Sequence, residues 1–149
     1  MLTKGGPKVL EFNARFGDPE TQVYLTRLEN DLVELLDASV NGTLGKIELK
    51  WKAAASVCVV MASGGYPGSY AKGKPILGLA EAAMLPNVKA FHAGTAMSGD
   101  QIVTNGGRVL GVTAWAKDLK SAQAAAYAAV GKICFDGAQF RRDIAAKAL

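Results

Sequence analysis

The stretch from Val9 to Glu20 constrains the fold most, because its pattern changes from that of a strand to that of a helix start. Its first residues, Val-Leu-Glu-Phe, are rich in apolar side chains that favour a strand. Asp18-Pro19-Glu20 has the composition of a helix start, since aspartate can cap free backbone N–H groups and proline suits the first helical position. We therefore expect a strand that passes directly into a helix beginning near residue 20.

Three polar side chains, Glu11, Asn13 and Arg15, occupy alternate positions of the expected strand. Strand side chains alternate between two faces, so all three would share one face. A carboxylate and an amide oxygen suit a hard cation such as magnesium, and the planar fork of arginine suits a phosphate. Together these groups would make half of a site for phosphoryl transfer. The alternative is the polar face of a half-buried strand, which the spacing alone favours.

Leucines at helical spacing predict that the helix runs from residue 20 to about residue 38 or 40, and Asn41-Gly42 would end it. Ahead of the strand, Lys4-Gly-Gly-Pro7 between two apolar segments predicts a hairpin within residues 1–10. A hairpin of this size is only marginally stable alone. The chain therefore looks like a piece of a longer protein.

From about residue 50 the composition changes to short strands with glycine-rich joints, which predicts two domains, 1–49 and 50–149. The expected strands are 56–62, 88–94, 101–105 and 108–116, the last two joined as a hairpin by Asn105-Gly-Gly. The expected helices are 79–85, 119–133 with Asp118 as its cap, and 138–149. The fold class is α+β: a hairpin and one long helix, then a small antiparallel β domain with packed helices.

Three further features leave alternatives open. The glycine-rich segment 63–74 matches neither the P-loop nor the dinucleotide fingerprint, and its backbone could approach a ligand or, as we favour, a neighbouring domain. His92 is the only histidine, so it fits a general base or, preferably, a hydrogen-bonded structural residue, and no histidine cluster can hold a metal. Arg141 and Arg142 fit a phosphate contact or a plain surface pair equally well.

The composition limits the function classes. Half of the 149 residues are hydrophobic, so global disorder is not expected. The net charge is +4, with −1 on residues 1–52 and +5 on residues 53–149, but no run of basic residues exceeds two. We therefore do not expect nucleic-acid binding. No apolar run approaches the roughly 20 residues that a membrane span requires, so no membrane partner is expected either.

The two cysteines, Cys58 and Cys134, do not form a disulfide framework, and both are expected to be small core residues. Neither has a nearby histidine or a Cys-x-x-Cys partner that would make it a nucleophile. Free cysteines without a signal peptide favour the cytoplasm.

Five blocks, taken in order, resemble the phosphoribosylamine–glycine ligase (glycinamide ribonucleotide synthetase) family of ATP-grasp enzymes, in its C-terminal portion. The blocks are Glu11-Phe-Asn-Ala-Arg-Phe-Gly-Asp-Pro-Glu20, Met61-Ala-Ser-Gly-Gly-Tyr-Pro-Gly68, Phe91-His-Ala-Gly-Thr95, Thr104-Asn-Gly-Gly-Arg-Val-Leu110 and Arg141-Arg-Asp-Ile144. The resemblance covers essentially the whole chain. It implies that residues 1–49 are the end of an ATP-grasp domain and that residues 50–149 are the family's C-terminal domain.

The resemblance also implies an activity and a set of site residues. The family joins glycine to phosphoribosylamine with ATP as co-substrate, through an acyl phosphate, to give glycinamide ribonucleotide for purine biosynthesis. Carried over to this chain, Glu11 and Asn13 resemble ligands of Mg²⁺ or Mn²⁺, and Arg15 resembles the phosphate-stabilising catalytic arginine. Asp18 belongs to the same signature and would contact substrate, although helix capping also explains it. The resemblance carries over no catalytic role for the later blocks, but the glycine density of 64–68, 92–95 and 106–108 suggests that they close the active site against the ATP-grasp domain.

The upstream parts of the family's enzyme are not represented in these residues. We therefore expect that this chain alone has no ligase activity, that those parts are its partners, and that exposed leucines at 20–40 drive self-association. Two alternatives are a non-catalytic interaction module with a ligase-like shape and a part of a related ATP-grasp carboxylase. The intact Glu11-x-Asn13-x-Arg15 argues against the first, and the blocks at 16–20 and 91–95 argue against the second.

Overall fold

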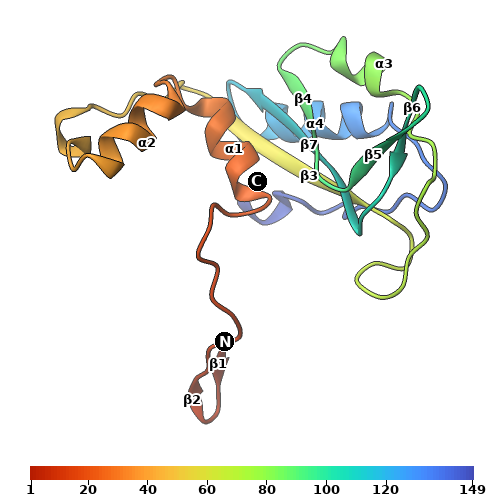
Figure 1. The fold of residues 1–149 in the computed structure, drawn as a ribbon, viewed down its shortest axis with the longest axis horizontal. Coiled ribbons are helices and arrows are strands. Elements are labelled where there is room, and N and C mark those ends of the chain that lie inside the picture. Colours follow the sequence, from red (N-terminus) through yellow and green to blue (C-terminus); the bar gives the residue numbers. More distant parts are fainter.

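A computed structural model describes all residues, 1–149, and has a three-stranded antiparallel sheet at its centre. The strand order is β3 (Ala55–Ala62), β7 (Arg108–Ala116) and β4 (Val88–His92), with β7 in the middle. Helix α4 (Leu119–Val130) packs on one face and α1 (Glu20–Arg27) on the other (Figure 1). We call residues 55–135 the sheet body. The α+β class expected from the sequence is confirmed.

The face of the sheet under α4 forms the main hydrophobic core. Cross-strand pairs such as Met61 with Leu110 and Val59 with Val112 point the same way and are buried. Three alanines on α4 face them with no exposed surface, so the helix approaches the sheet closely: Ala122, Ala126 and Ala129. Burying each large aliphatic side chain contributes about 1.5–3 kcal/mol. The Asp118 carboxylate accepts the Ser121 N–H at 2.7 Å, which confirms it as the cap of α4.

The opposite face of the sheet is covered by α1. Thr26 on α1 and Ser56 on β3 form a hydroxyl–hydroxyl hydrogen bond of 2.9 Å. Gly111 lies opposite, where a Cβ would stand 3.3 Å from the Cys58 sulfur and 3.5 Å from the Gln22 amide nitrogen. Because Gly111 has no side chain on this face of β7, α1 can lie close to the sheet. Cys58 is buried as predicted, whereas Cys134 is exposed, which contradicts its expected core position.

The single long helix expected over residues 20–40 is wrong, because the chain forms two helices, α1 and α2 (Leu32–Val40). Leu28 is extended and pairs with Trp51. The Asn30 side chain accepts the Lys50 N–H at 2.6 Å, and the Asp31 carboxylate accepts the Val33 N–H at 2.7 Å to cap the second helix. Two short polar side chains therefore bond the backbone outside the helix and interrupt it.

The hairpin expected between 101–105 and 108–116 is also wrong. The strands exist, but β6 (Gln101–Thr104) pairs with β5 (Thr95–Ser98), and β7 pairs with both β3 and β4. The actual hairpin turn is Gly99-Asp100, and Gly99 has a positive φ of 59°. Gly106 instead lets another segment pass: a Cβ there would stand 2.8 Å from the Gly94 Cα.

The remaining elements are short. Helix α3 (Leu79–Ala83) confirms the helix expected at 79–85, and 3₁₀ turns form at Leu44–Lys46 and Ala146–Ala148. The terminal helix expected over 138–149 is absent apart from that last turn. Tyr127 explains this, because its hydroxyl donates to the Arg141 carbonyl and accepts the Ile144 N–H, so these backbone groups bond α4 rather than a helix of their own. No helix combines the length and the apolar content needed to cross a bilayer.

The N-terminus forms the expected hairpin in a smaller version, β1 (Leu2–Thr3) with β2 (Gly6–Pro7). Residues 8–19, which we call the arm, join this hairpin to α1, and the hairpin stands away from the sheet body (Figure 1). The strand expected from Val9 is not formed. No backbone group of residues 9–16 bonds another backbone group, because no neighbouring strand lies beside them, and residues 8–16 are exposed.

Candidate functional site

The three polar residues of the arm form one connected chain of hydrogen bonds. Asn13 donates from its amide nitrogen to a Glu11 carboxylate oxygen at 3.2 Å. Arg15 donates from one terminal nitrogen to the Asn13 amide oxygen at 3.0 Å. The three side chains therefore lie on the same side of the arm, as their spacing predicts, although no strand holds them there.

The guanidinium of Arg15 has a second contact at the C-terminal end of the arm. Its other terminal nitrogen donates to the Phe16 carbonyl at 2.9 Å. The next carbonyl, of Gly17, accepts the Thr21 N–H at 3.0 Å and also the Thr21 hydroxyl, so the start of α1 fixes it. Arg15 is thus held at the point where the arm enters α1.

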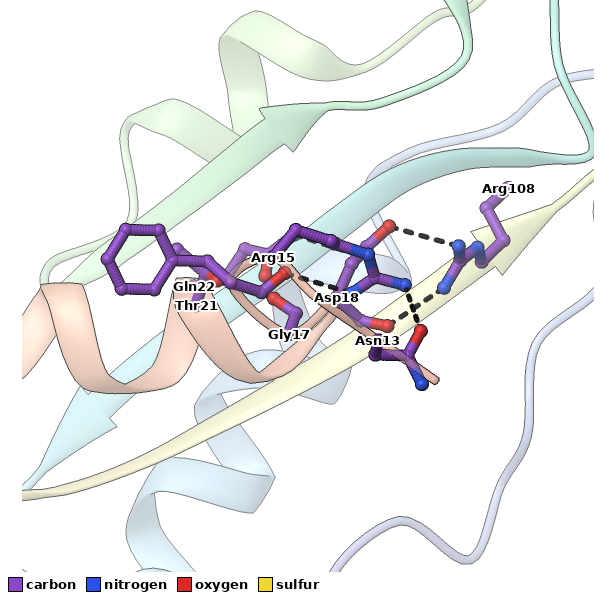
Figure 2. Close-up of polar contacts among 8 residues, drawn as sticks. Asn13, Arg15, Gly17, Asp18, Thr21, Gln22 and Arg108 are labelled. Atoms are coloured by element: carbon purple, nitrogen blue, oxygen red, sulfur yellow. Dashed lines mark hydrogen bonds and ion pairs between the residues drawn. The ribbon is translucent and has the colours of Figure 1, made fainter. Parts of the chain in front are cut away.

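Asp18 does not cap α1, which corrects the expectation from the sequence. Pro19 occupies the cap position, and no side chain bonds the free N–H groups there. The Asp18 carboxylate instead forms an ion pair of 3.2 Å with Arg108 and accepts the Gln22 amide at 3.1 Å. Arg108 also donates to the Asp18 carbonyl at 2.9 Å, so one guanidinium holds both the side chain and the backbone of Asp18 (Figure 2).

An open cleft of about 500 Å³ brings these groups together. The arm and the start of α1 contribute most of its lining, and the sheet body contributes Tyr66 and Arg108. The lining is polar and carries three carboxylates and two guanidinium groups: Glu11, Asp18, Glu20, Arg15 and Arg108. Such a mixture can bind a ligand that carries both anionic oxygens and a cation.

Glu11 and Asn13 are the candidate metal ligands of this cleft. Glu11 and Asn13 carry a carboxylate and an amide oxygen, the ligand types that Mg²⁺ and Mn²⁺ prefer, but here the Asn13 nitrogen faces Glu11 and the Asn13 oxygen accepts from Arg15. No group of three or more His, Cys, Asp or Glu side chains is arranged to hold a metal ion. A cation bound by both residues would need the Asn13 amide to turn its oxygen from Arg15 toward Glu11, and its remaining ligands would be water or a phosphate-bearing substrate.

A second cleft of about 510 Å³ adjoins the first and shares Tyr66 and Arg108 with it. Its lining includes Val60 and Ala62 of β3, together with Phe140 and Arg141.

Arg141 donates two hydrogen bonds to Asp143, at 2.9 and 2.6 Å, and these bonds hold the pKa of the Asp143 carboxyl below its usual range. Arg142 lies over the Phe140 ring at 5.3 Å. The Arg141–Arg142 pair thus makes local contacts that the sequence did not predict.

The sequence missed Tyr66 as a site residue and left Arg108 without a role. The Tyr66 ring lies over Gly107, where a Cβ would collide with it, so the glycine creates the space for the ring. The only signal in the sequence was the glycine density of the two segments. Of the three glycine blocks, 64–68 and 106–108 reach the clefts, whereas His92 bonds Thr95 at 3.0 Å and lines neither cleft.

Comparisons with known proteins give a consistent result. Residues 56–147 match the protein family described as "Phosphoribosylglycinamide synthetase, C domain". The chain is 55% identical over 146 residues to the phosphoribosylamine–glycine ligase of Synechocystis sp., covering 97% of this chain and 35% of that protein. It is 52% identical over 150 residues to the ligase of Pseudomonas aeruginosa, covering 100% of this chain and 35% of that protein.

A solved structure agrees with the sequence matches. The crystal structure of phosphoribosylamine–glycine ligase from Thermotoga maritima is similar with a TM-score of 0.68 and 36% identity. The similarity covers 96% of this chain and 34% of that one. The chain therefore spans about a third of the length of the relatives that it matches.

Proposed function

Because the chain belongs to the phosphoribosylglycinamide synthetase C-domain family, we propose that it works as the C-terminal part of a phosphoribosylamine–glycine ligase. The complete enzyme would use ATP to join glycine to phosphoribosylamine in purine biosynthesis. The observation that best supports this activity is the connected row of Glu11, Asn13 and Arg15 in a cleft completed by the sheet body.

The chemistry of the reaction explains why such a row would be needed. A carboxylate is a poor acyl donor, so a glycine carboxylate oxygen must first attack the γ-phosphorus of ATP, and ADP leaves with the electron pair of the broken P–O bond to give an acyl phosphate. The amine of phosphoribosylamine then attacks the acyl carbon, phosphate leaves with the electron pair of the broken C–O bond, and the nitrogen gives up one proton to solvent as the amide forms. Catalysis of phosphoryl transfer rests largely on positioning and on stabilising the charge that moves.

Each arm residue would have one role in this proposal. Arg15 would hold an oxygen of the transferred phosphoryl group with the donors of its guanidinium. Glu11 and Asn13 would hold Mg²⁺ or Mn²⁺, which when bound offsets the charge of the ATP phosphates. A substrate contact for Asp18 stays a prediction, and any such contact has to share the carboxylate with Arg108 and Gln22.

The division of the chain follows the same proposal. Residues 1–49 would be the end of an ATP-grasp domain and residues 50–149 the C-terminal domain. Helix α2 exposes apolar side chains, including Val33 and Val40, and lies beside an apolar groove of about 280 Å³. We expect the chain alone to be inactive, to self-associate through this surface, and to act in the cytoplasm.

The test is the turnover of ATP that depends on both glycine and phosphoribosylamine. We expect it from the complete enzyme and not from residues 1–149 alone. Glu11→Gln, which removes the charge and keeps the shape, should abolish most of this turnover, whereas Glu81→Gln on the exposed face of α3 should not. Turnover by the complete enzyme with a different acceptor, or equal rates for the Glu11→Gln and Glu81→Gln variants, would contradict the proposal.

A further inference from the structure

We propose that Arg108 is a positioning residue, which fixes the arm, and with it Glu11, Asn13 and Arg15, in the orientation that phosphoryl transfer needs. This inference rests on the proposed function. It assigns to the first residue of β7 a role in a site that lies about 90 positions earlier in the chain.

Within residues 1–149, the arm contacts the start of α1 through Gly17 and Asp18 but makes few contacts with the sheet body. Residues 8–16 are exposed, and the backbone groups of residues 9–16 bond no other backbone group. The contacts among Glu11, Asn13 and Arg15 connect arm residues only to one another or to Phe16. Their hydrogen bonds therefore set the shape of the row but not its place relative to the sheet body.

Arg108 joins the arm directly to the sheet body through Asp18. Its two terminal nitrogens reach different acceptors, the carbonyl at 2.9 Å and the carboxylate at 3.2 Å. Two contacts from one planar group restrict the rotation of Asp18 as well as its position. Asp18 lies three residues after Arg15, so an orientation fixed at Asp18 is passed to the row.

Arg108 is itself firmly held. It opens β7 opposite Ala62, where the register with β3 shifts, and the next residues, Val109 and Leu110, have no exposed surface. The Tyr66 ring packs against the preceding residue, Gly107. The Arg108 side chain is 37% exposed and lines both clefts, so it extends from a rigid strand into the site.

The inference is tested first by the order of the arm. In the 149-residue chain, ¹⁵N relaxation should show higher mobility of residues 11–17 in Arg108→Ala than in the unchanged chain, with Arg108→Lys between the two. Lys keeps the charge but replaces two separated nitrogens with one. Lys74→Gln is the matched control, because Lys74 forms an ion pair of 2.7 Å with Asp136 at similar exposure, away from the arm. Unchanged mobility in Arg108→Ala overturns the inference.

The second test is steady-state kinetics of the complete enzyme. Misplacing catalytic groups by about 1 Å costs about 100-fold in rate, so Arg108→Ala should lower kcat about 100-fold and Arg108→Lys about tenfold. The KM values for ATP, glycine and phosphoribosylamine should change much less. The losses of Arg108→Ala and Asp18→Ala should not multiply in the double variant, since both remove the same contact. A rise in one KM with an unchanged kcat would make Arg108 a substrate-binding residue and overturn the inference.

The two experiments separate this inference from the proposed function. If the arm becomes mobile, Arg108→Ala keeps full kcat and Glu11→Gln is inactive, the function stands and the positioning role is wrong. If Glu11→Gln is fully active, the proposed function itself fails, and the positioning role fails with it.

Discussion

The arm and the sheet body differ in their backbone hydrogen bonding and in the burial of their side chains. In the sheet body, β7 is bonded to a strand on each side, and its core side chains are fully buried. In the arm, residues 8–16 are exposed and residues 9–16 form no backbone pairs. Buried, paired segments account for most of the stability of a fold, and exposed segments can carry reactive groups with little effect on it. Stability and chemistry are therefore separable in this chain.

The largest effect should come from Arg15. In the complete enzyme, Arg15→Ala should lower kcat about 1,000-fold, because an arginine that stabilises a transferring phosphoryl group contributes at least that much. In the 149-residue chain the same change should leave the free energy of unfolding within about 0.5 kcal/mol, since the side chain contacts only its exposed neighbours.

Lys120→Ala is the control for Arg15, because Lys120 is exposed on α4, far from both clefts. It should change neither kcat nor stability. A large loss of stability in Arg15→Ala would show that the arm is part of the folded core and would break the comparison.

The converse change is Leu110→Ala in the sheet body. Leu110 has no exposed surface and pairs with Met61 under α4, so truncation leaves a cavity. Urea unfolding of the 149-residue chain should show a loss of about 2–5 kcal/mol. Met84→Ala, at the end of α3, where the side chain is 85% exposed, should stay within about 0.5 kcal/mol. Equal losses for the two variants would show that burial in the sheet body does not decide the loss of stability.

In the sheet body, the sequence predicted the strands correctly but not all of their pairing. The strands at 56–62 and 88–94 were found because long apolar runs bury themselves in the same way in many contexts. The pairing of 101–105 with 108–116 was predicted wrongly, because Asn105-Gly-Gly has the local sequence of a hairpin turn. Its glycines are used for a close approach to Gly94, which only the assembled fold reveals.

In the first 50 residues, local patterns were misleading where a polar side chain can bond either a nearby backbone group or a residue far away in the sequence. Asp18 has the position of a helix cap but bonds Arg108, a residue that no local pattern connects with it. Asn30 and Asp31 interrupt a leucine repeat that continues on both sides of them. The alternation of Glu11, Asn13 and Arg15 was informative even without a strand, because an extended chain keeps a period of about two.

The two cysteines offer a comparison within the sheet body itself. Cys58 is buried under α1, and this burial raises the pKa of its thiol, so little reactive thiolate is present near neutral pH. Cys134 is exposed. A disulfide reagent should therefore modify Cys134 about 100-fold faster, with Cys58 reacting only after local opening. Cys134→Ser should remove the fast phase and Cys58→Ser the slow one. A fast reaction of Cys58 would show that α1 detaches readily from the sheet.

The smallest effect concerns the cap of α4. The Ser121 N–H bonds to the Asp118 carboxylate and lowers the pKa of that carboxyl below its ordinary value. Since the folded pKa lies below the unfolded one, the contribution is complete above the unfolded pKa of about 4 and is lost as the pH falls through the folded pKa. Asp118→Ala should therefore lower the Tm by a few degrees near neutral pH, and this difference should shrink below about pH 4.

Asp118→Asn is the matched control for the cap, because asparagine keeps the accepting oxygen but does not titrate. Its Tm should lie near that of the unchanged chain at neutral pH. The difference in Tm between the Asn and Ala variants should then be independent of pH. If the Ala variant instead keeps a constant deficit against the unchanged chain from neutral pH down to acid, the carboxylate charge does not stabilise α4. The cap would then act through a hydrogen bond that does not depend on the carboxylate charge.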